Sequence, residues 1–171
     1  MSVPKRHARM QGTYFVTSRT WESRQLFSKA SACEMFIEAL VHYRDKGAFS
    51  LHAFVLMPEH FHILLTPAED VSLERTVMYI KGGSARRIGE KLNFKFPVWQ
   101  RGFSDHRIRD VQDYAVHVEY IEENPVKRRL VSAATEYPWS SASGQFQLVE
   151  PPQGLKPISI ALRIGTAEAV P

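Results

Sequence analysis

The sequence predicts an α+β fold, a ferredoxin-like sandwich in which helices pack on a mainly antiparallel sheet. Three observations lead to this fold class. Strand-type and helix-type patterns alternate along the chain, two strands follow each other with only a tight break between them, and 171 residues suit one domain. We expect this domain over residues 1–143, with a basic N-terminal arm, followed by an irregular tail over 144–171 that contains Pro and Gly.

The elements are expected in a definite order. Residues 13–21 are rich in β-branched and aromatic side chains and favour a first strand, and apolar residues at helical spacing over 29–46 favour a helix that Gly47 ends. The remaining elements are strands at 49–57 and 60–67 paired as a hairpin, a helix at 71–92, one or two strands within 99–109, and a helix at 110–124 that Pro125 ends.

Composition and charge restrict the class of function. Hydrophobic residues make up 44% of the chain and charged residues 23%, as in globular proteins, and no apolar run approaches the roughly 20 residues that span a bilayer. Cys33 is the single cysteine, which excludes an internal disulfide and fits a reducing cytoplasm. The formal net charge of +4 indicates either a polyanionic partner or a mildly basic enzyme. We expect a cytoplasmic, nucleoid-associated protein that does not bind membranes.

Two histidines stand on the predicted strand of the sequence MPEHFHILL. Because side chains alternate across a strand, His60 and His62 are expected on one face, with Phe61, Ile63 and Leu65 on the other. Their Cα atoms would lie roughly 6.5 Å apart, close enough for both rings to bind one metal ion. The alternative is an ordinary strand with polar residues on its outer face. A (β/α)₈ amidohydrolase is excluded because it needs about 250 residues.

The helix VQDYAVHVEYIEENP offers a partner for this pair. Val111, Tyr114, Ala115, Val118 and Ile121 share its apolar face. Tyr120 lies nearly opposite, and Asn124 is its neighbour at the i+4 position. The two polar side chains either form part of a site or are simply exposed.

Four motifs in order resemble the HUH tyrosine transposases, and most closely their branch of REP-associated tyrosine transposases. They are MPEHFHILL, VWQRGFSDHRIR, YIEENPVKRRLV and YPWSS, and the resemblance runs from about Thr13 to Ser141. It implies a single-stranded DNA endonuclease and strand transferase that cleaves near repeat hairpins through a 5′-phosphotyrosine. The chain departs from the family pattern in two places: the family often has Asn where this chain has Glu59, and Ala-Gly where this chain has Arg128-Arg129.

The resemblance also implies roles for individual residues. Tyr120 matches the nucleophile, and His60, His62 and Asn124 match the ligands of a divalent metal, Mg²⁺ or Mn²⁺. His117 is a rival third ligand or a proton carrier, and His106 could also approach the metal. The expected partner is single-stranded or hairpin DNA, and the protein is expected to act as a monomer or a homodimer.

Basic residues are the candidates for DNA contacts, since single strands are held by basic grooves and stacking aromatics. Each of them can equally be part of a solvated charged face. The candidates are Lys5, Arg6, Arg9, Lys81, Arg86, Arg87, Lys91, Arg101, Arg107, Arg109 and Arg128. Two alternative functions stay open: a catalytically inactive nucleic-acid-binding module of the same fold, and a metal-dependent hydrolase in which the tyrosine is incidental.

Overall fold

A four-stranded antiparallel sheet forms the centre of the molecule. The computed structural model describes residues 11–95, 97–153 and 155. Its strands are β1 (Tyr14–Arg19), β2 (Phe49–Met57), β3 (His60–Pro67) and β4 (Ser104–Arg107). They lie in the order β2-β3-β1-β4, and each neighbouring pair is antiparallel. The predicted fold class and the hairpin of the second and third strands are confirmed.

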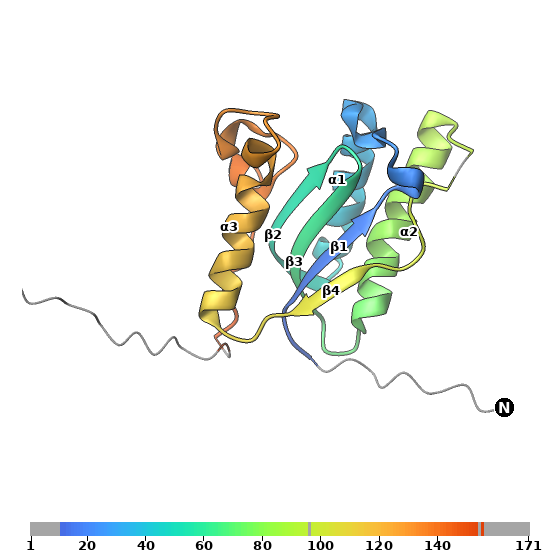
Figure 1. Ribbon diagram of the computed structural model, residues 1–171. Helices are drawn as coiled ribbons and strands as arrows, with labels where there is room; N and C mark the ends of the chain where they lie inside the picture. The colour runs from blue at the N-terminus through green and yellow to red at the C-terminus, as the bar shows by residue number, and fades with distance from the viewer. Residues whose placement is uncertain (1–10, 96, 154, 156–171) are drawn as a thin grey trace, which may run out of the picture.

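Three helices cover the two faces of this sheet (Figure 1). They are α1 (Ala30–Asp45), α2 (Leu73–Leu92) and α3 (Val111–Lys127), and short 3-10 turns connect some of the elements. Helices α1 and α2 lie together on one face, and α3 lies alone on the other. Helix α3 packs mainly on β2 and β3, so one helix faces the strand that carries the histidine pair. None of the helices in the described ranges combines the length and apolarity needed to cross a bilayer.

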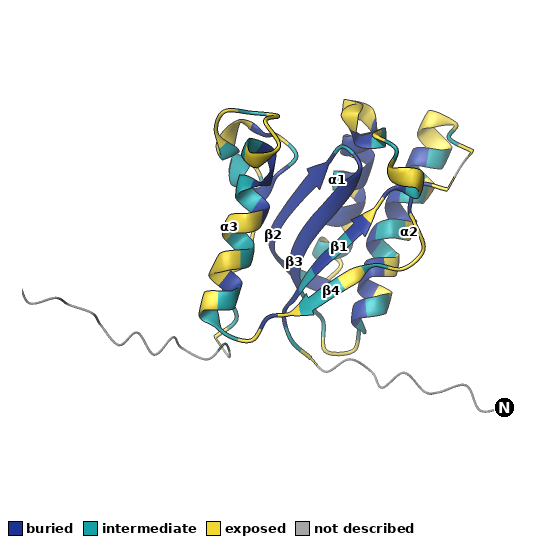
Figure 2. Ribbon diagram, in the orientation of Figure 1, coloured by how far each residue is buried: buried dark blue, intermediate teal, exposed yellow. Residues whose placement is uncertain are grey.

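Alternation along β3 creates a core on each side of the sheet. Phe61, Ile63 and Leu65 pack in the larger core under α1 and α2, whereas Leu64 belongs to the smaller core under α3. The strands β2 and β3 are buried almost throughout (Figure 2). His60 and His62 therefore point to the α3 side, as the alternation predicts, but they are buried there instead of standing on an open surface.

The end of α3 corrects the sequence prediction. Pro125 was expected to end the helix at Asn124, yet the helix continues through Pro125 to Lys127. Proline has no N–H to donate within the helix, but its own carbonyl accepts from Leu130 N at 2.9 Å, and Asn124 O accepts from Arg128 N at 3.0 Å. The proline lies within one turn of the helix end and is buried, so its packing and these bonds offset the single lost hydrogen bond.

The chain after α3 returns along the outer edge of β2. Leu56 N donates to Trp139 O at 2.8 Å, Val149 N donates to Leu51 O at 2.9 Å, and Phe146 packs edge-on against Phe54. The described part of the predicted tail, from residue 144 on, is thus bonded to the sheet through Val149 although it forms no regular element. Residues 156–171 lie outside the described residues, and the division at 143 stays a prediction.

Candidate metal centre and tyrosine helix

The two imidazole rings of β3 meet each other directly. His60 Nε2 and His62 Nε2 lie 3.1 Å apart, and the two residues are only 5% and 6% exposed. Two nitrogens from neighbouring positions of one face converge on one point, which is the arrangement that two ligands of a single ion require.

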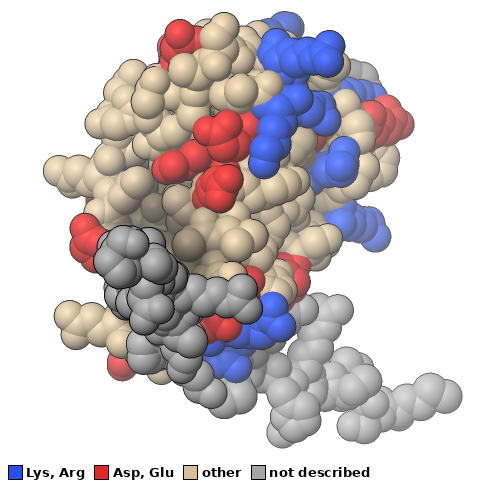
Figure 3. Space-filling view, turned by 60° about the vertical axis from the view of Figure 1, so that its left-hand side comes forward, with Lys and Arg blue, Asp and Glu red and all other residues tan. Residues whose placement is uncertain are grey.

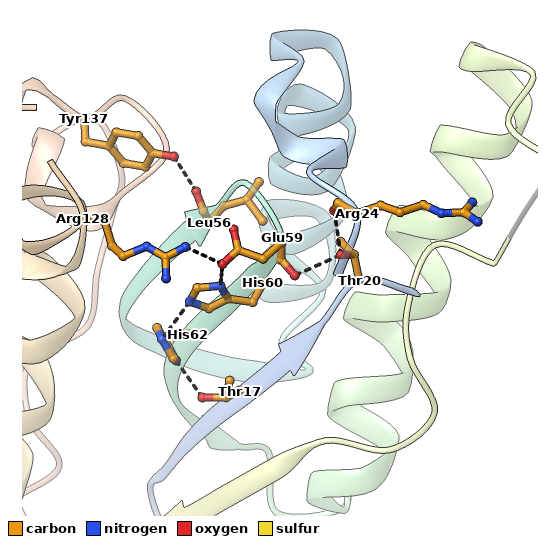
Figure 4. A network of polar contacts seen from close by, with 9 residues as sticks. All are labelled: Thr17, Thr20, Arg24, Leu56, Glu59, His60, His62, Arg128 and Tyr137. Carbon is orange, nitrogen blue, oxygen red and sulfur yellow. Dashed lines mark hydrogen bonds and ion pairs between the residues drawn. The ribbon is translucent and has the colours of Figure 1, made fainter. Parts of the chain in front are cut away.

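A hydrogen-bond chain orients both rings (Figure 4). His60 Nδ1 donates to Glu59 Oε1 at 3.0 Å, and the same oxygen accepts from Arg128 Nη2 at 2.7 Å. On the other side, His62 Nδ1 lies 2.7 Å from Thr17 Oγ1. Because a carboxylate can only accept, the proton of His60 stays on Nδ1, and its Nε2 lone pair is left for a metal. The Thr17 hydroxyl can accept or donate, so it tolerates either tautomer of His62.

Burial keeps both rings neutral. It lowers the pKa of His62 to about 3, an effect to which His60 and Arg19 add. Burial also lowers the pKa of His60, although the neighbouring Glu59 carboxylate acts in the opposite direction. A neutral imidazole is the form that binds a metal, so the pair is ready for a cation at physiological pH.

Glu59, one of the two departures from the family pattern, is therefore built into the site. Its second oxygen, Oε2, is buried without a hydrogen-bond partner among the described residues, and Figure 4 shows it turned away from His62. Glu59 thus contacts the histidine pair only through its bond to His60. Arg128, at the other departure from the family pattern, compensates the negative charge of Glu59.

Replacing Glu59 by Gln is expected to lower the affinity of the pair for Mn²⁺ by about 10–100-fold, the usual cost of losing an outer partner of a metal-bound histidine. The amide can donate to His60 Nδ1 as well as accept from it, so the ring loses its fixed tautomer. Mn²⁺ titration followed by electron paramagnetic resonance measures the change. Glu22→Gln, at an exposed turn, is the matched control, and an unchanged affinity in Glu59→Gln would show that the carboxylate has no such role.

The buried histidines lead to a prediction about the pH dependence of stability. His52, His60 and His62 are buried, and burial lowers the pKa of each below the ordinary value of about 6.5. The unfolded chain therefore binds more protons below pH 6.5, and the stability that is fully present above this pH is lost as the pH falls.

Urea denaturation in EDTA should accordingly show a free energy of unfolding that decreases from pH 7 to pH 5, by up to about 1.4 kcal/mol per pH unit for each histidine. The variant His52→Gln should have a shallower slope. A free energy that stays constant over this window would contradict the neutral state of these rings.

Tyr120 faces the histidine pair from α3. Its ring contacts the His62 ring edge-on at a centroid distance of 5.2 Å and the Phe15 ring at 5.8 Å, while 41% of the residue stays exposed. Lys127 Nζ lies 5.9 Å from the centre of the same ring. The structure thus brings together the tyrosine and the histidines that the sequence separates by about sixty positions.

Asn124 follows Tyr120 by one helical turn and is 7% exposed, so it lies inside, between α3 and the rest of the protein. Its position is that of a buried amide on the helix that faces the pair. Its role as third ligand remains a prediction, since the described contacts of Asn124 are those of its backbone.

His117 lies beside the Phe15 ring, and His106 lies beside His117. The Phe15 centroid is 5.2 Å from that of His62 and 4.7 Å from that of His117, and His106 stacks on His117 at 4.8 Å. His62 and His117 line the same groove, at Tyr120, and each of them contacts the Phe15 ring. His106 and His117 both contact Asp113, from which His106 Nε2 is 2.8 Å distant.

The predicted DNA-contacting residues divide into several groups. Arg86, Arg87 and Lys91 belong to α2, on the far face of the sheet from the pair, and form ion pairs with Glu90 or Glu38. Lys81 Nζ donates to Gln100 O at 2.7 Å and to Gly102 O at 2.6 Å. Lys5, Arg6 and Arg9 lie outside the described residues.

The other basic candidates lie on the β1, β4 and α3 side. Arg107 donates to Gln11 O, Arg109 pairs with Asp113, and Arg101 lines a groove of about 300 Å³ together with Arg19. Figure 3 shows Lys and Arg gathered along one side of the face turned toward the viewer, with Asp and Glu directly beside them. On this face of the molecule the Lys and Arg side chains therefore form a narrow band with Asp and Glu side chains next to it.

Three residues of the site were missed by sequence reasoning: Phe15, Thr17 and Arg19. They occupy alternate positions of β1, and the register pairs Thr17 with His62 and Arg19 with His60. Together with His62, Ser104 and Tyr120 they line a second groove, of about 460 Å³, that shares Thr17, Arg19 and Ser104 with the first. The alternation of side chains along TYFVTSR indicates that Phe15, Thr17 and Arg19 share one face of the strand. Only the register of β1 with β3 shows that this is the face of the histidine pair.

Comparison with known proteins identifies the family of the chain. A family model described as "Transposase IS200 like" matches residues 9–124. A REP-associated tyrosine transposase of Escherichia coli (strain K12) is 32% identical over 143 residues, which are 82% of each chain. A putative REP-associated tyrosine transposase of Haemophilus influenzae is 33% identical over 103 residues, or 54% of this chain and 58% of the relative.

Two solved structures have the same architecture. A REP-associated tyrosine transposase bound to a REP hairpin superposes with a TM-score of 0.66 at 29% identity, covering 86% of this chain and 89% of the other. A putative transposase from Deinococcus radiodurans has a TM-score of 0.50 at 19% identity, covering 72% and 97%, and supports the fold. The chain therefore belongs to the IS200-like transposase family, in its branch of REP-associated tyrosine transposases, and is an enzyme of the transposase type.

Proposed function

We propose that the protein cleaves and rejoins single-stranded DNA near repeat hairpins through a covalent bond to Tyr120. The observation that carries this proposal is the contact of the Tyr120 ring with His62, on a helix that packs across the buried histidine pair. A surface strand would need no such partner. A partly exposed tyrosine beside two neutral imidazoles that can hold a cation combines a nucleophile with a means of activating the reaction.

The reaction exchanges one phosphate ester for another. The Tyr120 oxygen bonds to phosphorus, the bond from phosphorus to the 3′ oxygen of the preceding nucleotide breaks, and a 5′-phosphotyrosine and a free 3′-OH result. The phenol gives up its proton and the leaving oxygen takes one up. Attack by a 3′-OH on the phosphotyrosine reverses these changes and joins strands, so no external energy source is consumed.

The residues present fit a divalent cation. His60 and His62 direct two neutral nitrogens to one point, and buried Asn124 is proposed to complete the set with its amide oxygen. Mg²⁺ or Mn²⁺ held there would polarise a non-bridging phosphate oxygen, and imidazole ligands suit Mn²⁺ at least as well as Mg²⁺. Glu59 and Thr17 orient the two rings, and Phe15 stacks on His62 and limits its movement.

Two joined grooves offer a path for the strand. The groove at Tyr120 and the groove at Arg101 share Thr17, Arg19 and Ser104, so both open on the same edge of β1 and β4. Arg19 and Arg101 would neutralise phosphates along it. The solved relative bound to a REP hairpin supports hairpin DNA as the partner. If the repeats are chromosomal, the protein acts at the nucleoid, in the cytoplasm. We propose a monomer or homodimer, with the N-terminal arm and residues 107–109 as further contacts.

A covalent adduct on a denaturing gel tests the function. The protein is incubated with a labelled single-stranded hairpin oligonucleotide in Mn²⁺, and a band of protein-linked DNA is expected that EDTA abolishes. Binding without an adduct would favour the inactive module, and cleavage without an adduct would favour a metal-dependent hydrolase that uses water.

A further inference from the structure

A second group of side chains of the types that bind metals lies at the start of α3, near Phe15. His106 comes from β4, and Asp113 and His117 come from the first half of α3. One donor atom from each residue lies within 4.8 Å of the other two. The proposed DNA chemistry uses none of the three.

The three side chains are already held in place. Asp113 Oδ2 lies 2.8 Å from His106 Nε2, Asp113 Oδ1 lies 3.2 Å from His117 Nδ1, and the two rings stack with an angle of 15° between their planes. Asp113 and His117 are i and i+4 on one face of the helix. The backbone N–H of Arg109 donates to Asp113 Oδ2 at 3.0 Å and so orients the carboxylate, as outer partners of metal ligands do.

The donors select a kind of ion. Two imidazole nitrogens and one carboxylate oxygen favour Zn²⁺, or Co²⁺ as its spectroscopic substitute, over Mg²⁺. His117 Nδ1 carries a proton, which it donates to Asp113 O at 2.7 Å. For this nitrogen to bind an ion, the proton has to move to Nε2, which frees the lone pair of Nδ1. The His106 side chain is 40% exposed, which leaves solvent access for a fourth ligand, and the Arg109 side chain, 75% exposed, can move from Asp113.

We infer that His106, Asp113 and His117 form a second divalent-metal site, of the zinc type, that fastens the tyrosine helix to β4. His117 precedes Tyr120 by three residues, so an ion bound here would fix the turn of α3 from which the tyrosine projects. The Phe15 ring contacts both His62 and His117, and the two histidines line the groove at Tyr120, so the proposed site lies beside the histidine pair. The inference does not depend on the proposed DNA cleavage.

Metal binding is tested in the full chain carrying His60→Ala and His62→Ala, so that the pair cannot contribute. The metal-free protein is titrated with Co²⁺, followed by visible absorption, and with Zn²⁺, followed by calorimetry and by the melting temperature. One equivalent of ion is expected, with an absorption spectrum typical of tetrahedral Co²⁺ and a Zn²⁺-dependent rise in melting temperature.

His106→Gln and His117→Gln, each added to this background, should weaken Zn²⁺ binding by at least about 100-fold, more than the loss of an outer partner costs. His42→Gln on α1 is the control and should leave binding unchanged. Circular dichroism confirms that each variant is folded, and the exposed position of His106 makes its variant the safer one.

Two outcomes would overturn the inference. The background variant, folded by circular dichroism, could bind no Zn²⁺ and show no rise in melting temperature, in which case the three residues form only a metal-free ion-pair cluster. Alternatively, Zn²⁺ could bind equally well after both substitutions, and the ion would then lie elsewhere.

Discussion

Tyr120→Phe is expected to abolish the covalent adduct with DNA and to reduce strand cleavage by at least about 10⁴-fold, in the range seen when a catalytic nucleophile is removed. Phenylalanine keeps the ring, and with it the contacts of position 120 with His62 and Phe15. Only the oxygen that would bond to phosphorus is lost. Affinity for the hairpin oligonucleotide should therefore stay within about twofold of the original, as measured by fluorescence anisotropy.

A matched control separates this effect from the general loss of a phenol. Tyr79, on α2, stacks on Tyr43 on the opposite face of the sheet from the histidine pair. Tyr79→Phe should form the adduct at the original rate. An adduct in Tyr120→Phe, or its loss in Tyr79→Phe, would mean that the nucleophile is another residue.

His62→Gln is expected to have the second largest effect, a loss of about 10³-fold in Mn²⁺-dependent cleavage. The value corresponds to several kcal/mol of charge stabilisation by a metal, at about 1.4 kcal/mol for each factor of ten. One imidazole would remain in the pair, and the Thr17 hydroxyl would lose its ring partner. Adduct yield against Mn²⁺ concentration measures the loss, and direct Mn²⁺ titration shows whether it arises from metal binding.

His52→Gln is the control for this substitution. His52 is also a buried histidine of the sheet, but its ring lies beside Thr66 and the backbone of Val149, at the outer strand β2. The variant should retain cleavage. If His62→Gln cleaved as fast as His52→Gln, the pair would have no part in catalysis, and the hydrolase and transferase readings would both need another metal centre.

The local elements of this fold were predictable, because their signals are local. The hairpin at β2 and β3 was predicted with its observed bounds, and the period of two along β3 put His60 and His62 on one face. The end of α3 was not predicted, because the rule about residues before proline describes an isolated chain, whereas the buried Pro125 is held by packing.

The site was predictable only in part, for a related reason. Tyr120 and the histidine pair were named from type and spacing, and the structure places the Tyr120 and His62 rings in contact. Phe15 and Thr17 carry no comparable signal: their roles come from the pairing of β1 with β3, a relation between segments about 45 residues apart. The contacts of His117 with Phe15 and Asp113 are likewise a property of packing that no helical wheel contains.

The return of the chain along β2 has a consequence for association between molecules. An open outer strand offers unpaired N–H and C=O groups to another chain and so promotes aggregation. Here Trp139 and Val149 hydrogen-bond to the backbone of β2 at Leu56 and Leu51, and the Ser141 hydroxyl bonds to the backbone of Phe54. Residues 139–149 thus cover the outer edge of β2. A chain truncated before Trp139 keeps every strand of the sheet but exposes this edge, and it should form oligomers in which the edges of two sheets pair.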